Sequence, residues 1–116
     1  MKSKEKNKAL DKVAAWKQLL LQELSWSVAK ADQHITRLLE FFKHLQYGSA
    51  TLVYRSKQGE VLLTTASLIP YADYFRRPFE WENLNNTIPF WNEEKKCWTT
   101  FDMCNFIDWR IAYPFN

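Results

Sequence analysis

Glycine and cysteine are scarce in this sequence, and their scarcity excludes several kinds of site. The only glycines, Gly48 and Gly59, are eleven residues apart, whereas a phosphate-binding loop needs several glycines within a few residues. The two cysteines, Cys97 and Cys104, form neither a disulfide framework nor a close pair of metal ligands. We expect both to be reduced thiols that are buried as small hydrophobic side chains.

Histidines are equally few. His34 and His44 are ten residues apart, which on one continuous helix is about 15 Å along the axis and too far to share a metal ion. A nucleophilic triad needs a base and an orienting acid near the nucleophile, and two histidines confined to the helical part offer little material for one. Glu80 and Glu82 are paired carboxylates, but we interpret them as solvated loop charge. The sequence therefore predicts a non-enzymatic protein without a metal or cofactor.

Long apolar runs are also missing. No eighteen apolar residues occur in succession, and the charged start MKSKEKNKALDK is not followed by an apolar segment. This pattern predicts neither a membrane-spanning helix nor a signal peptide. We expect a cytoplasmic protein that does not bind a membrane.

Aromatic residues, by contrast, are abundant. Six Trp, five Tyr and eight Phe make up 16% of the 116 residues. A small core does not need so many large rings, and aromatic side chains are enriched where proteins meet their partners. Some of these rings are therefore expected on a partner-binding surface.

Positive charge is concentrated at the start of the chain. Residues 1–46 hold nine Lys or Arg against five Asp or Glu, whereas residues 47–116 hold seven against eight. Five of the nine are lysines between Lys2 and Lys12. Because positive charge at the start of a helix opposes the helix macrodipole, we predict that residues 1–9 form a basic flexible tail.

Residues 10–47 show the periodicity of amphipathic helices. Ser25 or Ser27 is placed to cap a second helix, and Gly48 follows its expected end. The pattern leaves open whether the segment is one kinked helix or two. Apolar residues recur at steps of three and four over its second half, and these are expected to form the core: Val28, Ala31, Ile35, Leu38, Leu39, Phe42 and Leu45.

Residues 48–116 change to the short period of β-strands. Two runs rich in β-branched residues flank a turn at 56–59, and two more flank a turn at 93–96. An irregular turn at 103–105 precedes a last strand at 106–113. The sequence thus predicts an α+β fold in which an N-terminal helical segment precedes a five-stranded SH3-like β-barrel.

Two runs of the β-domain, YGSATLVYRSKQGEVLLTTASL and PFWNEEKKCWTTFDMCNFI, resemble a known family. Its members are small proteins of unknown function with an SH3 β-barrel fold, common in Bacteroides-type bacteria and in their phages and mobile elements. The resemblance covers residues 47–107, and it implies a barrel packed with the helices as one domain, in a phage or mobile-element setting. The matching positions are Lys57 to Gly59, Ser67 with Leu68, Phe90 with Trp91, Glu94 with Lys95, Trp98 with Phe101, and Asn105 with Phe106.

The segment 69–86 has no clear period, and loops of such length in compact domains are often functional. It interleaves aromatic rings with arginines, the residue types that dominate interface hot spots and that also stack on nucleic-acid bases. Each ring could instead pack back over the barrel and the helix. The candidate partner-binding residues are Tyr71, Tyr74, Phe75, Arg76, Arg77, Phe79 and Trp81.

Two functions remain open. The first is a phage or mobile-element regulator or inhibitor that binds a host protein or protein-RNA machine, such as an RNA-guided defence nuclease, in the cytoplasm of a bacterial host. The alternative is an accessory protein that binds RNA or DNA through the basic helical part and the loop. The basic candidates for that role are Lys2, Lys4, Lys6, Lys8, Lys12 and Arg37.

Overall fold

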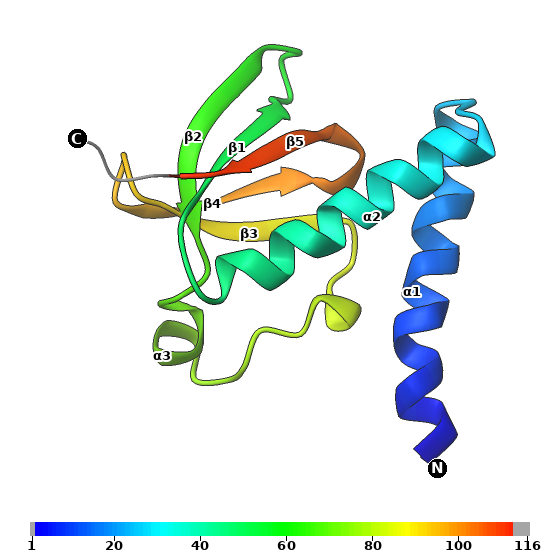
Figure 1. Cartoon of the computed structure of the whole chain (residues 1–116), viewed down its shortest axis with the longest axis horizontal. Coiled ribbons are helices and arrows are strands. Elements are labelled where there is room, and N and C mark those ends of the chain that lie inside the picture. The colour runs from blue at the N-terminus through cyan, green and yellow to red at the C-terminus, as the bar shows by residue number, and fades with distance from the viewer. Residues whose placement is uncertain (1, 113–116) are drawn as a thin grey trace.

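The computed structural model describes residues 2–112, and the side chains from residue 8 onward. Two long helices, α1 (Lys2–Glu23) and α2 (Val28–Leu45), precede a five-stranded antiparallel sheet (Figure 1). The predicted α+β arrangement is confirmed. The strands are β1 (Ala50–Arg55), β2 (Val61–Ser67), β3 (Thr87–Asn92), β4 (Cys97–Asp102) and β5 (Phe106–Ile111).

The helix α1 begins at Lys2, eight residues before the expected start at residue 10. The boundary predicted between a tail at 1–9 and a helix is therefore wrong. Lysine, glutamate and alanine make up six of the eight residues from Lys2 to Ala9. These residue types favour helix over coil, and this preference outweighs the unfavourable placement of positive charge. Its predicted flexibility stays a prediction.

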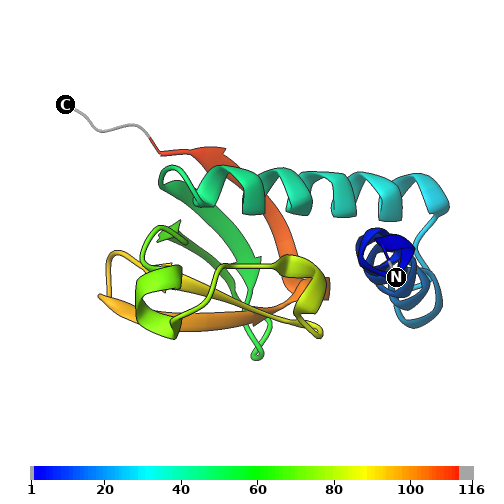
Figure 2. The same cartoon turned by 90° about the horizontal axis from the view of Figure 1, so that it is seen from below.

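The break between α1 and α2 settles the number of helices as two. Ser25 has φ 56°, a left-handed conformation that a right-handed helix cannot contain. Ser27 then caps α2, because its hydroxyl accepts a hydrogen bond from the Lys30 backbone N–H. The break lets α1 cross beside α2 instead of extending it (Figure 2).

The strands follow the order β4-β3-β2-β1-β5, so β1 pairs with both β2 and the C-terminal β5. Both hairpin turns lie where the sequence predicts them, between β1 and β2 and between β3 and β4. The predicted last strand ends at Ile111, and Tyr113 lies outside the described residues. Alternate residues of β1 (Ala50, Leu52 and Tyr54) are buried, as expected for a sheet with one face on a core.

The segment 69–86 is not structureless. It contains a one-turn helix, α3 (Tyr71–Phe75), and a 3-10 turn, η1 (Trp81–Asn83). A second 3-10 turn, η2 (Met103–Asn105), connects β4 to β5 as predicted. The long connection therefore consists of two short helical turns joined by extended backbone.

The helix α2 supplies the centre of the core and lies along the sheet on β1 and β5 (Figure 2). Five of the seven predicted positions are buried, Leu39 is half-buried, and Val28 at the helix start is 54% exposed. Phe41 and His34 are buried although they were not predicted. Phe41 contacts Phe106 and Trp109 of β5, whereas Phe42 contacts Phe79 of the connection before β3. The buried face of α2 therefore packs against both segments.

The helix α1 joins this core through Trp16 and Leu20, both fully enclosed. The Trp16 ring lies 6.4 Å from the ring of Phe42. Leu10, in the N-terminal half of α1, is 68% exposed. One continuous cluster of buried side chains thus runs from α1 through α2 into the barrel.

Candidate functional site

The predicted aromatic loop divides into a buried and an exposed part. Tyr71 is only 6% exposed, and its ring contacts those of Phe75 and Phe79 at centroid distances of 4.6 and 5.2 Å. The assignment of Tyr71 to a partner-binding surface is wrong. The ring of Tyr71 also contacts that of Trp98 and belongs to the buried core cluster.

Phe79 and Trp81 also pack inward. The ring of Phe79 lies 5.4 Å from that of Phe42, and the ring of Trp81 lies 6.0 Å from that of Trp16. Both side chains are half-buried against the core. The contact between loop and helices thus uses part of each ring, and the assignment of Phe79 and Trp81 to a partner surface stays a prediction.

The rest of the loop faces solvent. Tyr74 is 65% exposed, and Arg76 and Arg77 are exposed beside it. Arg76 ends α3 in the left-handed conformation, with φ 61° and ψ 35°. The guanidinium of Arg77 lies 6.0 Å from the ring centroid of Phe75. Neither arginine forms an ion pair with another described residue, so both charges are available to a partner.

Two tryptophans that the sequence analysis named as family-matching positions, but not as binding residues, complete this surface. Trp91 and Trp98 are cross-strand partners of β3 and β4, and their centroids are 5.5 Å apart. Trp98 also lies 5.5 Å from Tyr74 and 4.9 Å from Phe75. The sequence did contain a signal for this pair. Both tryptophans lie two residues from the turn at 93–96, and aromatic residues at equal distance from a hairpin turn pair on one face of the sheet. We call Tyr74, Phe75, Trp91 and Trp98, with Arg76 and Arg77, the aromatic patch.

The basic residues proposed for nucleic-acid binding differ in their surroundings where the structure describes their side chains. The side chains of Lys2, Lys4 and Lys6 lie outside the described part of the structure. Lys8 is exposed, whereas Lys12 donates a hydrogen bond to the carbonyl oxygen of Leu84. Lys12 thus attaches α1 to the loop, and its charge is not directed to an open surface.

Arg37, the last basic candidate, is held by the protein. Its Nε and one terminal nitrogen donate to the same carboxylate oxygen of Asp108, at 3.1 and 2.8 Å. Further bonds reach the Trp109 carbonyl and Glu40. Partial burial alone would raise the pKa of Asp108, but hydrogen bonds from Arg37 and the Trp109 backbone outweigh it and lower that pKa. Arg37 therefore joins α2 to β5, and its positive charge is offset by the carboxylates of Asp108 and Glu40.

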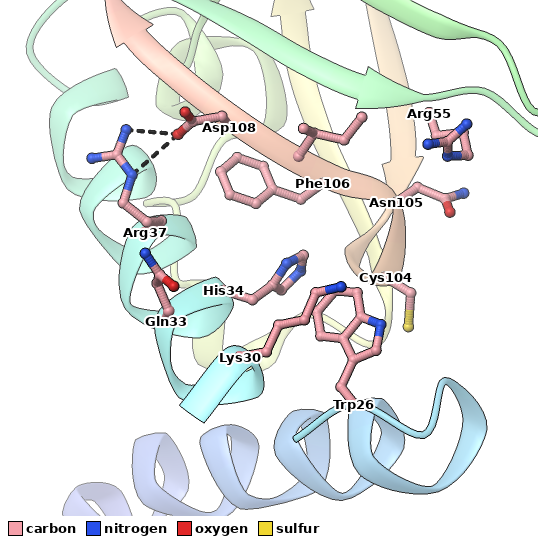
Figure 3. Close-up of a pocket in the computed structure, with 11 residues that line it drawn as sticks. Trp26, Lys30, Gln33, His34, Arg37, Arg55, Cys104, Asn105, Phe106 and Asp108 are labelled. Carbon is pink, nitrogen blue, oxygen red and sulfur yellow. Dashed lines mark hydrogen bonds and ion pairs between the residues drawn. The ribbon is translucent and has the colours of Figure 1, made fainter. Parts of the chain in front are cut away.

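A pocket of about 430 Å³ lies beside this ion pair, between α2, η2 and β5 (Figure 3). The residues that line the pocket come from separate parts of the chain, so no local sequence motif predicted it. Trp26 and Lys30 border one end and Arg55 the other, with Gln33 and Asn105 on its sides (Figure 3). The remaining lining residues are His34, Arg37, Cys104, Phe106, Ile107 and Asp108.

His34 is a buried part of the pocket wall. Its Nε2–H donates to the carbonyl oxygen of Met103 at 3.0 Å, since a carbonyl can only accept. Burial, opposed by that hydrogen bond and aided by nearby Lys30, lowers the pKa of His34. The ring is thus neutral near pH 7, and its Nδ1 is left as a hydrogen-bond acceptor.

Neither cysteine has the surroundings of a catalytic nucleophile. Cys97 is exposed at the start of β4, so the expectation that both thiols are buried is wrong for this one, which lies at the end of an edge strand. Cys104 is half-buried, and burial together with Asp102 raises the pKa of its thiol to about 11. A thiol with a raised pKa is a poor nucleophile.

Among residues 2–112, no three His, Cys, Asp or Glu side chains lie close enough together to hold a metal ion. Within the same range, neither long helix is apolar enough to cross a membrane.

A comparison with known protein families identifies the fold. The model of a family described as WYL_2, with an Sm-like SH3 β-barrel fold, matches residues 38–107, more than half of the 116 residues. The match begins within α2 and ends at the start of β5. No curated protein and no solved structure matches the chain significantly.

Proposed function

Because the chain belongs to the WYL_2 family of Sm-like SH3 β-barrels, we propose that it is a non-enzymatic protein that uses this barrel to present the aromatic patch to a protein partner. The observation that carries the proposal is the cluster of four aromatic rings beside two unpaired arginines. Tryptophan, tyrosine and arginine are the residues most often found at the energetic centre of protein interfaces.

The arrangement of the patch favours a protein partner. Trp91 and Trp98 are half-buried and held by neighbouring rings, so they lose little conformational freedom on binding. Exposed Tyr74 lies 5.5 Å from Trp98, and the two exposed arginines follow Phe75 directly in the chain. A partner that fits this chemistry has an apolar depression bordered by carboxylates, since guanidinium groups pair with carboxylates through two parallel hydrogen bonds.

The biological setting that we propose is regulation of a bacterial host by a phage or mobile element. It rests on the resemblance of residues 47–107 to small proteins of Bacteroides-type bacteria and their phages. In that setting the partner is a cytoplasmic host protein or protein-RNA machine, such as an RNA-guided defence nuclease. The protein acts by occupying a surface of that machine and does not need chemistry of its own.

Affinity purification from a bacterial host lysate, with and without nuclease, tests this proposal. The test variant combines Tyr74→Ala, Arg76→Asn and Arg77→Ala, where Asn is chosen because it tolerates the left-handed conformation of residue 76. The matched control combines Lys43→Ala and Lys95→Ala, which removes the same charge from exposed positions outside the patch. We expect a nuclease-resistant partner that the control retains and the test variant loses.

Equal capture by both variants would contradict the proposal. A second variant, with Lys in place of both Arg76 and Arg77, separates charge from geometry. It keeps the charge but loses the planar group that binds a carboxylate at two points. We expect it to bind the protein partner more weakly than the wild type does.

A further inference from the structure

The strand β4 has one edge that no other described segment pairs with. It pairs with β3 along its whole length, from Cys97 to Asp102, and stands last in the strand order of the sheet. Among the described residues, only those of β3 form hydrogen bonds with its backbone groups. Its six residues include no lysine, proline, glycine or bulge, the features that commonly protect an edge strand. This edge is therefore open to a further strand.

The edge at the other end of the sheet is protected. There the carbonyl oxygen of Trp109 in β5 accepts a hydrogen bond from Arg37 of α2 at 2.7 Å. The same helix packs along β1 and β5. Because proteins commonly protect the edges that they leave unpaired, an open edge opposite a protected one indicates a place for a partner.

The backbone groups at the open edge follow from the strand register. The backbone N–H of Glu93, directly after β3, donates to β2. Backbone groups alternate in direction along an antiparallel strand, so the even-numbered residues of β3 direct theirs to β4. Phe90 is one of these and is paired with Thr99. The backbone N–H and C=O groups of Trp98 and Thr100 therefore point to the open edge.

A strand added at this edge would extend the aromatic patch. Trp91 and Trp98 are cross-strand partners, and Trp98 has no cross-strand neighbour on its other side. Tyr74 and Phe75 lie 5.5 and 4.9 Å from the ring of Trp98. The residue opposite Trp98 on an added strand would meet these rings, which favours an apolar or aromatic side chain there.

The second half of β4 borders a pocket of about 270 Å³ that the turn between β1 and β2 also lines. Lys57 and Arg55 line it and form no ion pair with a described residue. Tyr54 is 8% exposed, and its hydroxyl makes no hydrogen bond with a described residue. Burial raises the pKa of Tyr54, so the hydroxyl keeps its proton and can donate. The one carboxylate in the lining, Asp102, already accepts a hydrogen bond from the Cys104 N–H, and the pocket therefore favours an added acidic side chain.

From these observations we propose that an extended segment of the protein partner pairs with the open edge of β4 as a further strand. Main-chain hydrogen bonds to Trp98 and Thr100 hold the segment, and its side chains give specificity. It carries an apolar residue opposite Trp98 and an acidic residue at the pocket beside Thr100. The inference rests on the proposed function, since Trp98 belongs to the aromatic patch, and it states which kind of segment the partner offers. A second copy of this chain suits the edge less well, because the only carboxylate of its own β4 is the hydrogen-bonded Asp102.

Selection of peptides tests the inference on the full chain. The probe is a displayed library of random peptides of about twelve residues, enough to span a strand. Peptides that bind the wild type are then selected against Thr100→Pro, which removes an N–H at the open edge. Proline is tolerated on an edge strand where the missing N–H faces solvent, and Thr100→Ala, which keeps the N–H, is the matched control. We expect selected peptides to bind Thr100→Pro at least about tenfold more weakly than the wild type, and Thr100→Ala within about twofold.

Amide hydrogen exchange measured by NMR locates the added strand without a variant. A bound peptide should slow exchange of the Trp98 and Thr100 amides at least about tenfold. The amide of Thr99, which faces β3, should change little. Lys57→Glu should weaken binding of the selected peptides, whereas Lys43→Glu makes the same charge change at an exposed position of α2 and should leave it unchanged.

Three results would each overturn the inference. The first is that no peptide distinguishes the wild type from Thr100→Pro, and the second is unchanged exchange of the Trp98 and Thr100 amides in the complex. The third is a dimer that forms as the protein concentration rises and is lost in Thr100→Pro, because a second copy would then occupy the edge.

Capture from the host lysate separates this inference from the proposed function. A partner that is lost by the Tyr74, Arg76 and Arg77 variant but kept by Thr100→Pro would overturn the inference alone. A partner kept by the Tyr74, Arg76 and Arg77 variant would overturn the proposed function, and the peptide measurements would then decide the inference by themselves.

Discussion

The rings of Trp16 in α1 and Trp81 in η1 lie with their centroids 6.0 Å apart and join the first helix to the long connection before β3. Trp16 is fully buried between this ring and that of Phe42. The hydrogen bond from Lys12 to the Leu84 carbonyl supports the same junction. The position of α1 therefore depends on a loop residue that the sequence suggested was a binding residue.

Truncation of Trp81 should destabilise the protein. Trp81→Ala removes the ring that covers Trp16, and we expect a loss of about 2 kcal/mol in the free energy of unfolding, less than for a fully buried tryptophan. Urea denaturation followed by circular dichroism measures it. Tyr74→Ala is the control, since its side chain is mostly exposed and should cost about 0.5 kcal/mol or less. If the two variants are equally stable, the junction does not have the role assigned to it.

The stripe on α2 should be the most sensitive part of the core. Leu38 and Phe42 are fully buried, and truncation of either to alanine leaves a cavity that we expect to cost about 2 to 5 kcal/mol. Val28→Ala on the same helix is the control, because Val28 is largely exposed. Thermal unfolding should show lower melting temperatures for the first two variants alone. Unchanged melting of Leu38→Ala would argue against this helix packing.

The ion pair between Arg37 and Asp108 should couple α2 to β5. A double-mutant cycle with Arg37→Ala and Asp108→Ala is expected to give a coupling of about 1 kcal/mol, since both groups are partly exposed. The pKa of Asp108 is lowered in the folded state, so the folded carboxylate binds a proton less readily than the unfolded one. Its contribution is present above about pH 4 and is lost as the pH falls further. Asp108→Asn should lose this part of the acid sensitivity.

His34 should make stability depend on pH in a higher range. Its pKa is lowered by burial, so below the unfolded value of about 6.5 the unfolded chain binds a proton that the folded chain does not. Stability is therefore greatest above about pH 6.5 and decreases as the pH falls toward 5. His34→Gln should flatten the curve of melting temperature against pH between these values. A wild-type curve that is flat over this interval would contradict the assignment.

The secondary structure was largely contained in local sequence patterns. The stripe on α2, the turn at 56–59 and the alternation along β1 each follow from residues close in sequence, and physical periodicity is enough to find them. The start of α1 was harder to place, because helix propensity and the charge of the lysines act in opposite directions there.

Local sequence patterns did not show which aromatic residues are buried and which face solvent. Tyr71 and Trp81 looked the same as Tyr74 in sequence, yet the first two pack inward and the third faces solvent. Which ring is covered depends on where α1 and α2 lie, and their contacts with the loop join residues far apart in the chain. Periodicity carries no information about such contacts.

The sequence alone determined the class of the fold, the strand count and the absence of glycine-rich loops, because composition and period depend only on neighbouring residues. The tertiary structure alone decided which side chains share a surface. It brought Trp98 into contact with both Tyr74 and Trp91. It also paired Arg37 with Asp108 and placed Trp26 and Arg55 in one pocket. The physical reason is that packing between distant segments sets these distances, and each segment has its position only when the others are in place.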